Sequence, residues 1–184
     1  MIERISDSPD IRKQVEANQD SQKKLELLIP GLRGYRERED LRVADELLRN
    51  QVSDKLDGAK VNLEQLRKAL AAASDYTNLA SVGSLISQVQ QVSGTVRHAQ
   101  QGYAGFAPPI KIDDDKLNKL YDYDYAFVSA AFQLADATAP GNLVYDPTSP
   151  GNLQAAISNV TGLLSDFKQK WGARMQVVED IGVK

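Results

Sequence analysis

A regular spacing of apolar residues between positions 41 and 70 constrains the fold of this chain most. Nine apolar residues recur there at steps of three and four: Leu41, Ala44, Leu48, Val52, Leu56, Ala59, Leu63, Leu66 and Leu70. Their mean step is close to 3.6 residues, the period of a straight α-helix with one buried face. The spacing therefore predicts one long helix over about residues 36–74, weakened only at Gly58, where glycine costs about 1 kcal/mol relative to alanine.

Similar periodicity in other parts of the chain predicts an all-α protein. The expected helices cover about residues 9–28, 36–74, 78–101, 114–137 and 151–180. Connections between them carry proline, glycine and capping residues, which end helices. A chain of 184 residues is long enough to bury a core as one domain, residues 1–184. We predict an elongated antiparallel bundle of four to five helices with coiled-coil-like packing.

Composition argues against several classes of function. The net charge is −3, and basic residues alternate with acidic ones, so no basic surface for nucleic acid is expected. The chain has no cysteine, which excludes disulfides and thiolate chemistry and fits a cytoplasmic location. We see neither an apolar core of a signal peptide nor a run of about 18 apolar residues that would predict a membrane span.

The segment IPGLRGYRERED, residues 29–40, interrupts two helical stretches and has two interpretations. In the first it is a corner between helices, where Gly31 or Gly34 adopts positive φ and Tyr35 packs as a hydrophobic staple. In the second, arginines at the start of the next helix bind an anion. A Walker-type loop needs a preceding strand and a final Lys-Ser/Thr, and neither is present. The corner is favoured.

Metal and nucleophile chemistry find little support in the sequence. A di-iron bundle needs repeated Glu-x-x-His pairs, but His98 is the single histidine and no glutamate stands three residues before it. The run Asp113–Asp115 lacks the alternation of a calcium loop, and it fits the start of a helix, where negative charge complements the dipole. No cofactor, metal site or catalytic residue is predicted, and we expect a protein that is not an enzyme.

The sequence YDYDYAF, residues 121–127, is the most unusual feature, because Asp124 falls on the apolar line of its helix. A carboxylate on an inward line needs a partner, and we expect an arginine from residues 33–42. One interpretation is a buried Arg–Asp–Tyr network between helices; the alternative is a solvated aspartate face with tyrosine rings at its rim. The candidate polar cluster comprises Arg33, Tyr35, Arg38, Arg42, Asp45, Tyr103, Phe106, Tyr121 and Asp124.

Two segments together resemble an uncharacterised family of bacterial and archaeal helical proteins. They are IPGLRGYREREDLRVADELLR (29–49) and QQGYAGF with KIDDDKLNKLYDYD (100–124). The family pattern is I-P-G-x-x-G-Y-x-x-[KR]-E-x-x-R-x-A-D-x-x-[LV]-R, followed by a G-Y-A-G-F-like turn. The chain departs from it at Asp40-Leu41 and lacks a strongly charged helical tail. The resemblance implies a helical fold and suggests that the two glycine corners meet, but it brings no activity.

Three functional hypotheses remain open at the level of sequence. The first is a non-catalytic helical scaffold or protein-interaction module in the cytoplasm, with a protein partner or self-association. The second is a peripheral membrane or envelope-stress helical protein; it is not favoured, because the first helix has lysines and arginines but only a narrow apolar face. The third is a carboxylate metal-binding bundle, or an enzyme, that uses the Arg/Asp/Tyr cluster.

Overall fold

The computed structural model describes residues 21–32, 38–99 and 114–182, with side chains described for 21–32, 43–99 and 115–180. Its four long helices are α2 (Arg38–Ala72), α3 (Tyr76–Arg97), α4 (Asp114–Ala137) and α5 (Pro150–Gly182). Residues 21–28 are also helical, and no strand occurs in the described part of the chain. The prediction of an all-α bundle is confirmed, and α3 ends a few residues earlier than its apolar pattern indicated.

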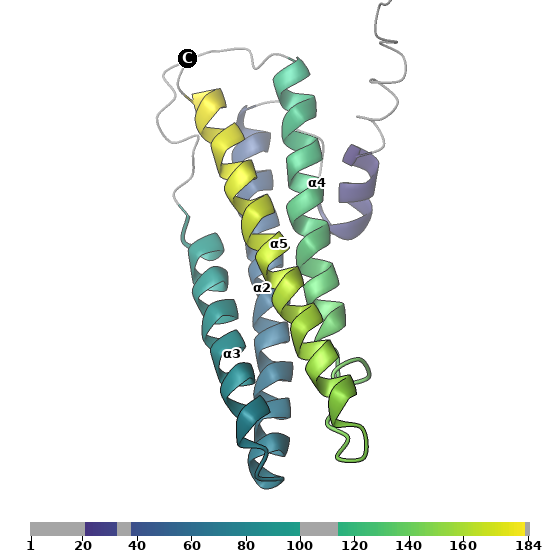
Figure 1. Ribbon diagram of the computed structural model, residues 1–184. Helices are drawn as coiled ribbons and strands as arrows, with labels where there is room; N and C mark the ends of the chain where they lie inside the picture. The colour runs from purple at the N-terminus through teal and green to yellow at the C-terminus, as the bar shows by residue number, and fades with distance from the viewer. Residues whose placement is uncertain (1–20, 33–37, 100–113, 183–184) are drawn as a thin grey trace, which may run out of the picture.

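The four helices form two hairpins that pack against each other (Figure 1). In the first, α2 and α3 are joined by a tight turn at residues 73–75; in the second, α4 and α5 are joined by residues 138–149. The predicted antiparallel arrangement is found within each hairpin. Between the hairpins α2 contacts α4 and α3 contacts α5, and the helices of each of these two pairs run in the same direction.

Residues 21–32 pack beside both α2 and α4. Lys24 lies over the ring of Tyr125 in α4, and the amide of Gln51 in α2 donates a hydrogen bond to the carbonyl of Pro30. Leu25 and Ile29 are fully buried in the main core. Residues 21–32 therefore act as a fifth element that closes one side of the bundle (Figure 1).

The predicted apolar line of α2 is the centre of the core. Every member whose side chain is described is buried: Ala44, Leu48, Val52, Leu56, Ala59, Leu63, Leu66 and Leu70. Gly58 leaves α2 continuous from Arg38 to Ala72. Within the described residues, we find no helix whose length and apolar character would let it cross a membrane.

Two small side chains let α2 and α3 approach closely. The hydroxyl of Ser53 donates to the backbone carbonyl of Ser93 at 3.3 Å. The hydroxyl of Ser93 can donate either to the backbone carbonyl of Ser53 at 3.4 Å or to the carboxylate of Asp57 at 2.7 Å. One turn further, the Arg97 guanidinium bonds to both Asp54 and Asp57 at 2.9 Å. The hydrogen bond with Asp54 raises the pKa of Arg97 above its ordinary value, so the charge of Arg97 is retained and directed toward α2.

The corner after residues 21–28 has the backbone conformation that the sequence predicted for one of its two glycines. Gly31 has φ of +88°, in the left-handed region that favours glycine. The backbone of Leu32 donates to the carbonyl of Ile29, and the Leu32 side chain is buried. Gly34 and Tyr35 lie outside the described residues.

We expect Gly31→Ala to lower the free energy of unfolding by about 1 kcal/mol, because alanine is strained at positive φ. Gly172→Ala is the matched control: Gly172 is exposed in α5 and a Cβ there would meet nothing within 4 Å. Because alanine is the better helix former, this control should gain about 0.5–1 kcal/mol. Urea unfolding measures both, and two shifts of the same sign would contradict the corner conformation.

Candidate functional site: a buried charge network

The structure describes the side chains of three of the nine residues in the predicted polar cluster: Asp45, Tyr121 and Asp124, all buried. The other six, whose side chains lie outside the described set, are Arg33, Tyr35, Arg38, Arg42, Tyr103 and Phe106. Residues 33–35 and 102–106 also lie outside the described residues, so the suggested meeting of the two glycine corners stays a prediction. The buried carboxylates Asp45 and Asp124 are held in one network by arginines that the cluster did not include.

Arg174 of α5 is the centre of this network. Its Nε donates to Asp124 Oδ1 of α4 at 2.5 Å, and its Nη2 donates to Asp45 Oδ1 of α2 at 2.6 Å. Both contacts cross the interior between helices that are far apart in sequence. A guanidinium group supplies a rigid planar set of donors, so it can satisfy two carboxylates at once.

Arg49 extends the network to the end of α3. Its Nε donates to Asp45 Oδ2 at 2.9 Å, one helical turn away in α2. Its Nη1 donates to the backbone carbonyls of Arg97 and Ala99, each at 3.1 Å. The last carbonyls of a helix have no partner within the helix and carry partial negative charge, so an arginine stabilises them. All four long helices are thereby joined through two arginines and two aspartates.

The charged groups of this network are almost completely buried, so each of them needs a partner of opposite charge. The side chains of Arg174 and Asp124 are 2% and 1% exposed, and those of Arg49 and Asp45 are 7% and 5% exposed. A buried charge without a partner costs several kcal/mol. Here two positive and two negative groups alternate along the series Arg49–Asp45–Arg174–Asp124, so each described charge lies beside one of opposite sign. Among the described side chains, Ser129 Oγ is the buried polar atom without a hydrogen-bond partner.

Aromatic rings complete the surroundings of Arg174. Its guanidinium carbon lies 5.0 Å from the ring centroid of Phe127 and 5.6 Å from that of Trp171. The two rings are tilted with their centroids 5.5 Å apart, and Phe167 lies 6.5 Å from Phe127. A weakly hydrated guanidinium is attracted to the faces of such rings. The two rings therefore contribute cation–π contacts to Arg174 in addition to its two ion pairs.

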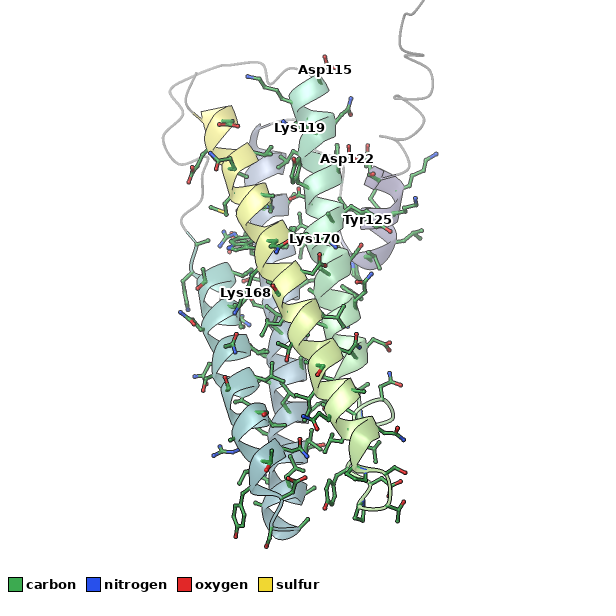
Figure 2. All side chains as sticks on the ribbon, viewed as in Figure 1. Asp115, Lys119, Asp122, Tyr125, Lys168 and Lys170 are labelled. Atoms are coloured by element: carbon green, nitrogen blue, oxygen red, sulfur yellow. The ribbon has the colours of Figure 1, made fainter. Side chains whose placement is uncertain are left out.

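The prediction that Asp124 is paired is confirmed, and one partner that the structure shows is Arg174 of α5. The side chains of the arginines at 33–42, from which a partner was expected, lie outside the described set. The signal for Arg174 was readable: it lies three residues after Trp171 and four before Val178, both on the inward line of α5. A charged residue at such a position needs a buried counter-charge. The alternative of a solvated aspartate applies to Asp122, which is exposed on the outer side of α4 (Figure 2).

The contrast between these two aspartates gives a test within one helix. We expect Asp124→Ala to lower the free energy of unfolding by about 3 kcal/mol, because one donor of the buried Arg174 loses its counter-charge. Asp122→Ala, with the same change of residue type in the same helix, should stay within about 0.5 kcal/mol of the parent. Chemical denaturation followed by circular dichroism measures both. Equal losses would show that Asp124 is not held in a desolvated ion pair.

Outside this network, the described residues offer little for catalysis. They include no group of three histidine or carboxylate side chains placed to hold a metal ion. His98 is exposed at the end of α3. The side chains of the network are almost entirely buried, and they link helices to one another. The arrangement is suited to fixing the relative positions of the four helices.

A second feature is a surface groove between α3 and α5. Polar uncharged side chains form most of its lining: Asn78, Ser81, Ser84 and Gln88 from α3, and Gln154, Ser158 and Thr161 from α5. Leu85 and Ile157, both buried, form its floor. We call this groove and the exposed residues beside it on the two helices the α3/α5 face.

Comparison of the chain with models of protein families, with curated proteins and with solved structures found no match.

Proposed function

We propose that this protein is a non-catalytic helical interaction module, in which a rigid bundle presents the α3/α5 face to a protein partner. The observation that carries the proposal is the lack of charge on this face. About a quarter of the chain is charged (26%), but α3 has a single charged residue, Arg97, at its end. In α5 there is none between Pro150 and Ser165.

Depletion of charge is what distinguishes the centre of a protein interface from the rest of a protein surface. A solvated helix normally carries lysine and glutamate on its outer side. The exposed positions of α3 instead carry serine, glutamine and threonine, among them Ser81, Ser84 and Gln91. Burying these uncharged groups against a partner costs much less than burying charges, provided that each finds a hydrogen-bond partner there. The charge network supports the same role, because it holds the helices in one arrangement.

A cytoplasmic location is part of the proposal. The absence of cysteine supports it, since a chain of this kind has no need of an oxidising compartment to fold.

Photo-crosslinking tests whether the α3/α5 face meets a protein. A photoreactive amino acid is placed at Ser84 or Ser158 on the face, and at Lys119 of α4 as a control; all three positions are exposed. We expect adducts of defined mass from Ser84 and Ser158 in cells that naturally produce the protein, and none from Lys119. If neither face position yields an adduct, the face does not bind a protein and the proposal is wrong.

A further inference from the structure

We propose that the α3/α5 face binds a second copy of this chain, so that the protein is a two-fold symmetric homodimer. This inference deepens the proposed function and rests on it, because it assigns the partner of the same face. Two pairs of parallel helices from different hairpins are in contact, α2 with α4 and α3 with α5. Residues 21–32 pack beside α2 and α4, whereas no described segment lies over the groove between α3 and α5.

The lining of the α3/α5 groove is compatible with binding to the same surface of a second chain. A two-fold interface brings the same surface of both chains together, so any charge on it meets a like charge near the axis. The groove walls carry hydroxyl and amide groups, such as those of Ser84, Gln88 and Gln154, and each of these can both donate and accept hydrogen bonds. The hydroxyl and amide groups of two identical faces can therefore satisfy each other, while the Lys168 ammonium stays bonded to Gln88 of its own chain.

The charges that border this face make contacts within their own chain; at the start of α3, the Asp75 carboxylate accepts from the backbone and side-chain amides of Asn78. Lys168 of α5 donates from its ammonium group to Gln88 Oε1 of α3 at 2.8 Å, and this link crosses the groove toward one end (Figure 2). Arg97 is directed to Asp54 and Asp57 of α2, away from α5. The uncharged surface between them extends to the other end of α3. A strongly charged partner, such as a nucleic acid or an acidic peptide, finds no complementary charge there.

The size of the face is sufficient for a dimer. A helix of 22 residues, the length of α3, is about 33 Å long, and two adjacent helices are about 20 Å wide. The footprint is then on the order of 650 Å² per copy, or about 1,300 Å² in total, which lies within the range of specific interfaces. Small residues beside the groove, including Ala80, Ala155 and Gly162, are exposed and allow the helices of two copies to approach closely.

Sedimentation velocity of the purified full-length chain tests the dimer directly. The expected result is a species with twice the mass of the 20.2 kDa chain, in exchange with monomer as concentration falls. A single species with the mass of one chain at the highest soluble concentration overturns the inference.

Charge substitutions then test whether the α3/α5 face forms the dimer. The double variant Ser84→Glu, Gln154→Glu places four like charges in the interface of a dimer, and its dimer dissociation constant should rise at least about tenfold. The control, Asn50→Glu with Gln133→Glu, adds equal charge at exposed positions of α2 and α4. Circular dichroism verifies that both variants are folded. A dimer weakened only by the control, or by neither variant, contradicts this assignment of the interface.

The crosslinking experiment separates this inference from the proposed function. Adducts at Ser84 or Ser158 with the mass of two chains support the dimer. Adducts of another mass overturn the dimer and leave the proposed interaction module in place. If no adduct forms at either position, both the dimer and the proposed interaction module are wrong.

Discussion

Replacing Arg174 with alanine is expected to lower the free energy of unfolding by about 3–5 kcal/mol, the loss typical of removing one partner from a buried ion pair. The side chain of Arg174 is 2% exposed and bonds to Asp45 and Asp124. In the variant Asp45 keeps Arg49, but the arginine that links it to Asp124 is gone. For most small domains this loss is a large fraction of the total stability.

Arg97→Ala is the control for the same chemistry at the surface. Arg97 also bonds to two aspartates, Asp54 and Asp57, but its side chain is 34% exposed. Exposed ion pairs contribute about 0–1 kcal/mol, so a loss of no more than about 1 kcal/mol is expected. Urea unfolding at neutral pH measures the two variants together. If Arg174→Ala costs no more than Arg97→Ala, the network is solvated and does not hold the helices together.

A third variant distinguishes charge from geometry. Arg174→Lys keeps the positive charge but replaces a planar group with five donors by a single ammonium, which cannot serve both carboxylates in the same way. We expect a stability between those of the parent and Arg174→Ala. A lysine variant as stable as the parent would show that charge alone is sufficient at this position.

The helices were predictable from sequence because each presents a long apolar line with one period. The line from Leu41 to Leu70 predicted α2 to within a few residues at each end, and α4 was predicted as residues 114–137, which matches Asp114–Ala137. Periodicity identifies the buried side of a helix. It does not specify which other helix that side meets, so the parallel contacts between the hairpins were not predictable.

Periodicity also predicted one part of the charge network. Asp124 interrupts an apolar line, and this showed that it needs a partner. That Arg174 is among its partners depends on the register between segments 50 residues apart, which local patterns do not encode. Asp45 and Arg49 both belong to the 29–49 segment on which the family resemblance was based. We infer that this part of the segment serves to join the helices.

The uncharged face illustrates a different limit. Residues 78–101 are rich in serine and glutamine, a composition typical of the solvated side of a helix. What the sequence did not show is that the uncharged start of α5 lies beside it, on the other wall of the groove. The uncharged residues of α3 and those at the start of α5 form one surface because the two hairpins pack against each other.

Phe127→Ala is the second substitution with a large expected effect. Phe127 is fully buried, and its ring contacts Phe167, Trp171 and the guanidinium of Arg174. Truncating a buried phenylalanine leaves a cavity and typically costs about 3–5 kcal/mol. Phe132→Ala is the control in the same helix: Phe132 is half-buried and lies under Lys55, 4.6 Å from the ring centroid. Its loss should be less than half as large, as guanidinium denaturation can measure.

Combining Phe127→Ala with Arg174→Ala tests whether the ring stabilises the network. Residues in direct contact commonly show coupling energies of about 0.5–3 kcal/mol. If the Phe127 ring holds the guanidinium in place, the double variant should lose less stability than the two single losses added together. The pair Phe132→Ala with Arg97→Ala, for which no contact is seen, should be additive. Additive losses for Phe127 and Arg174 as well would mean that the carboxylates alone position the arginine, and that the aromatic rings contribute only packing.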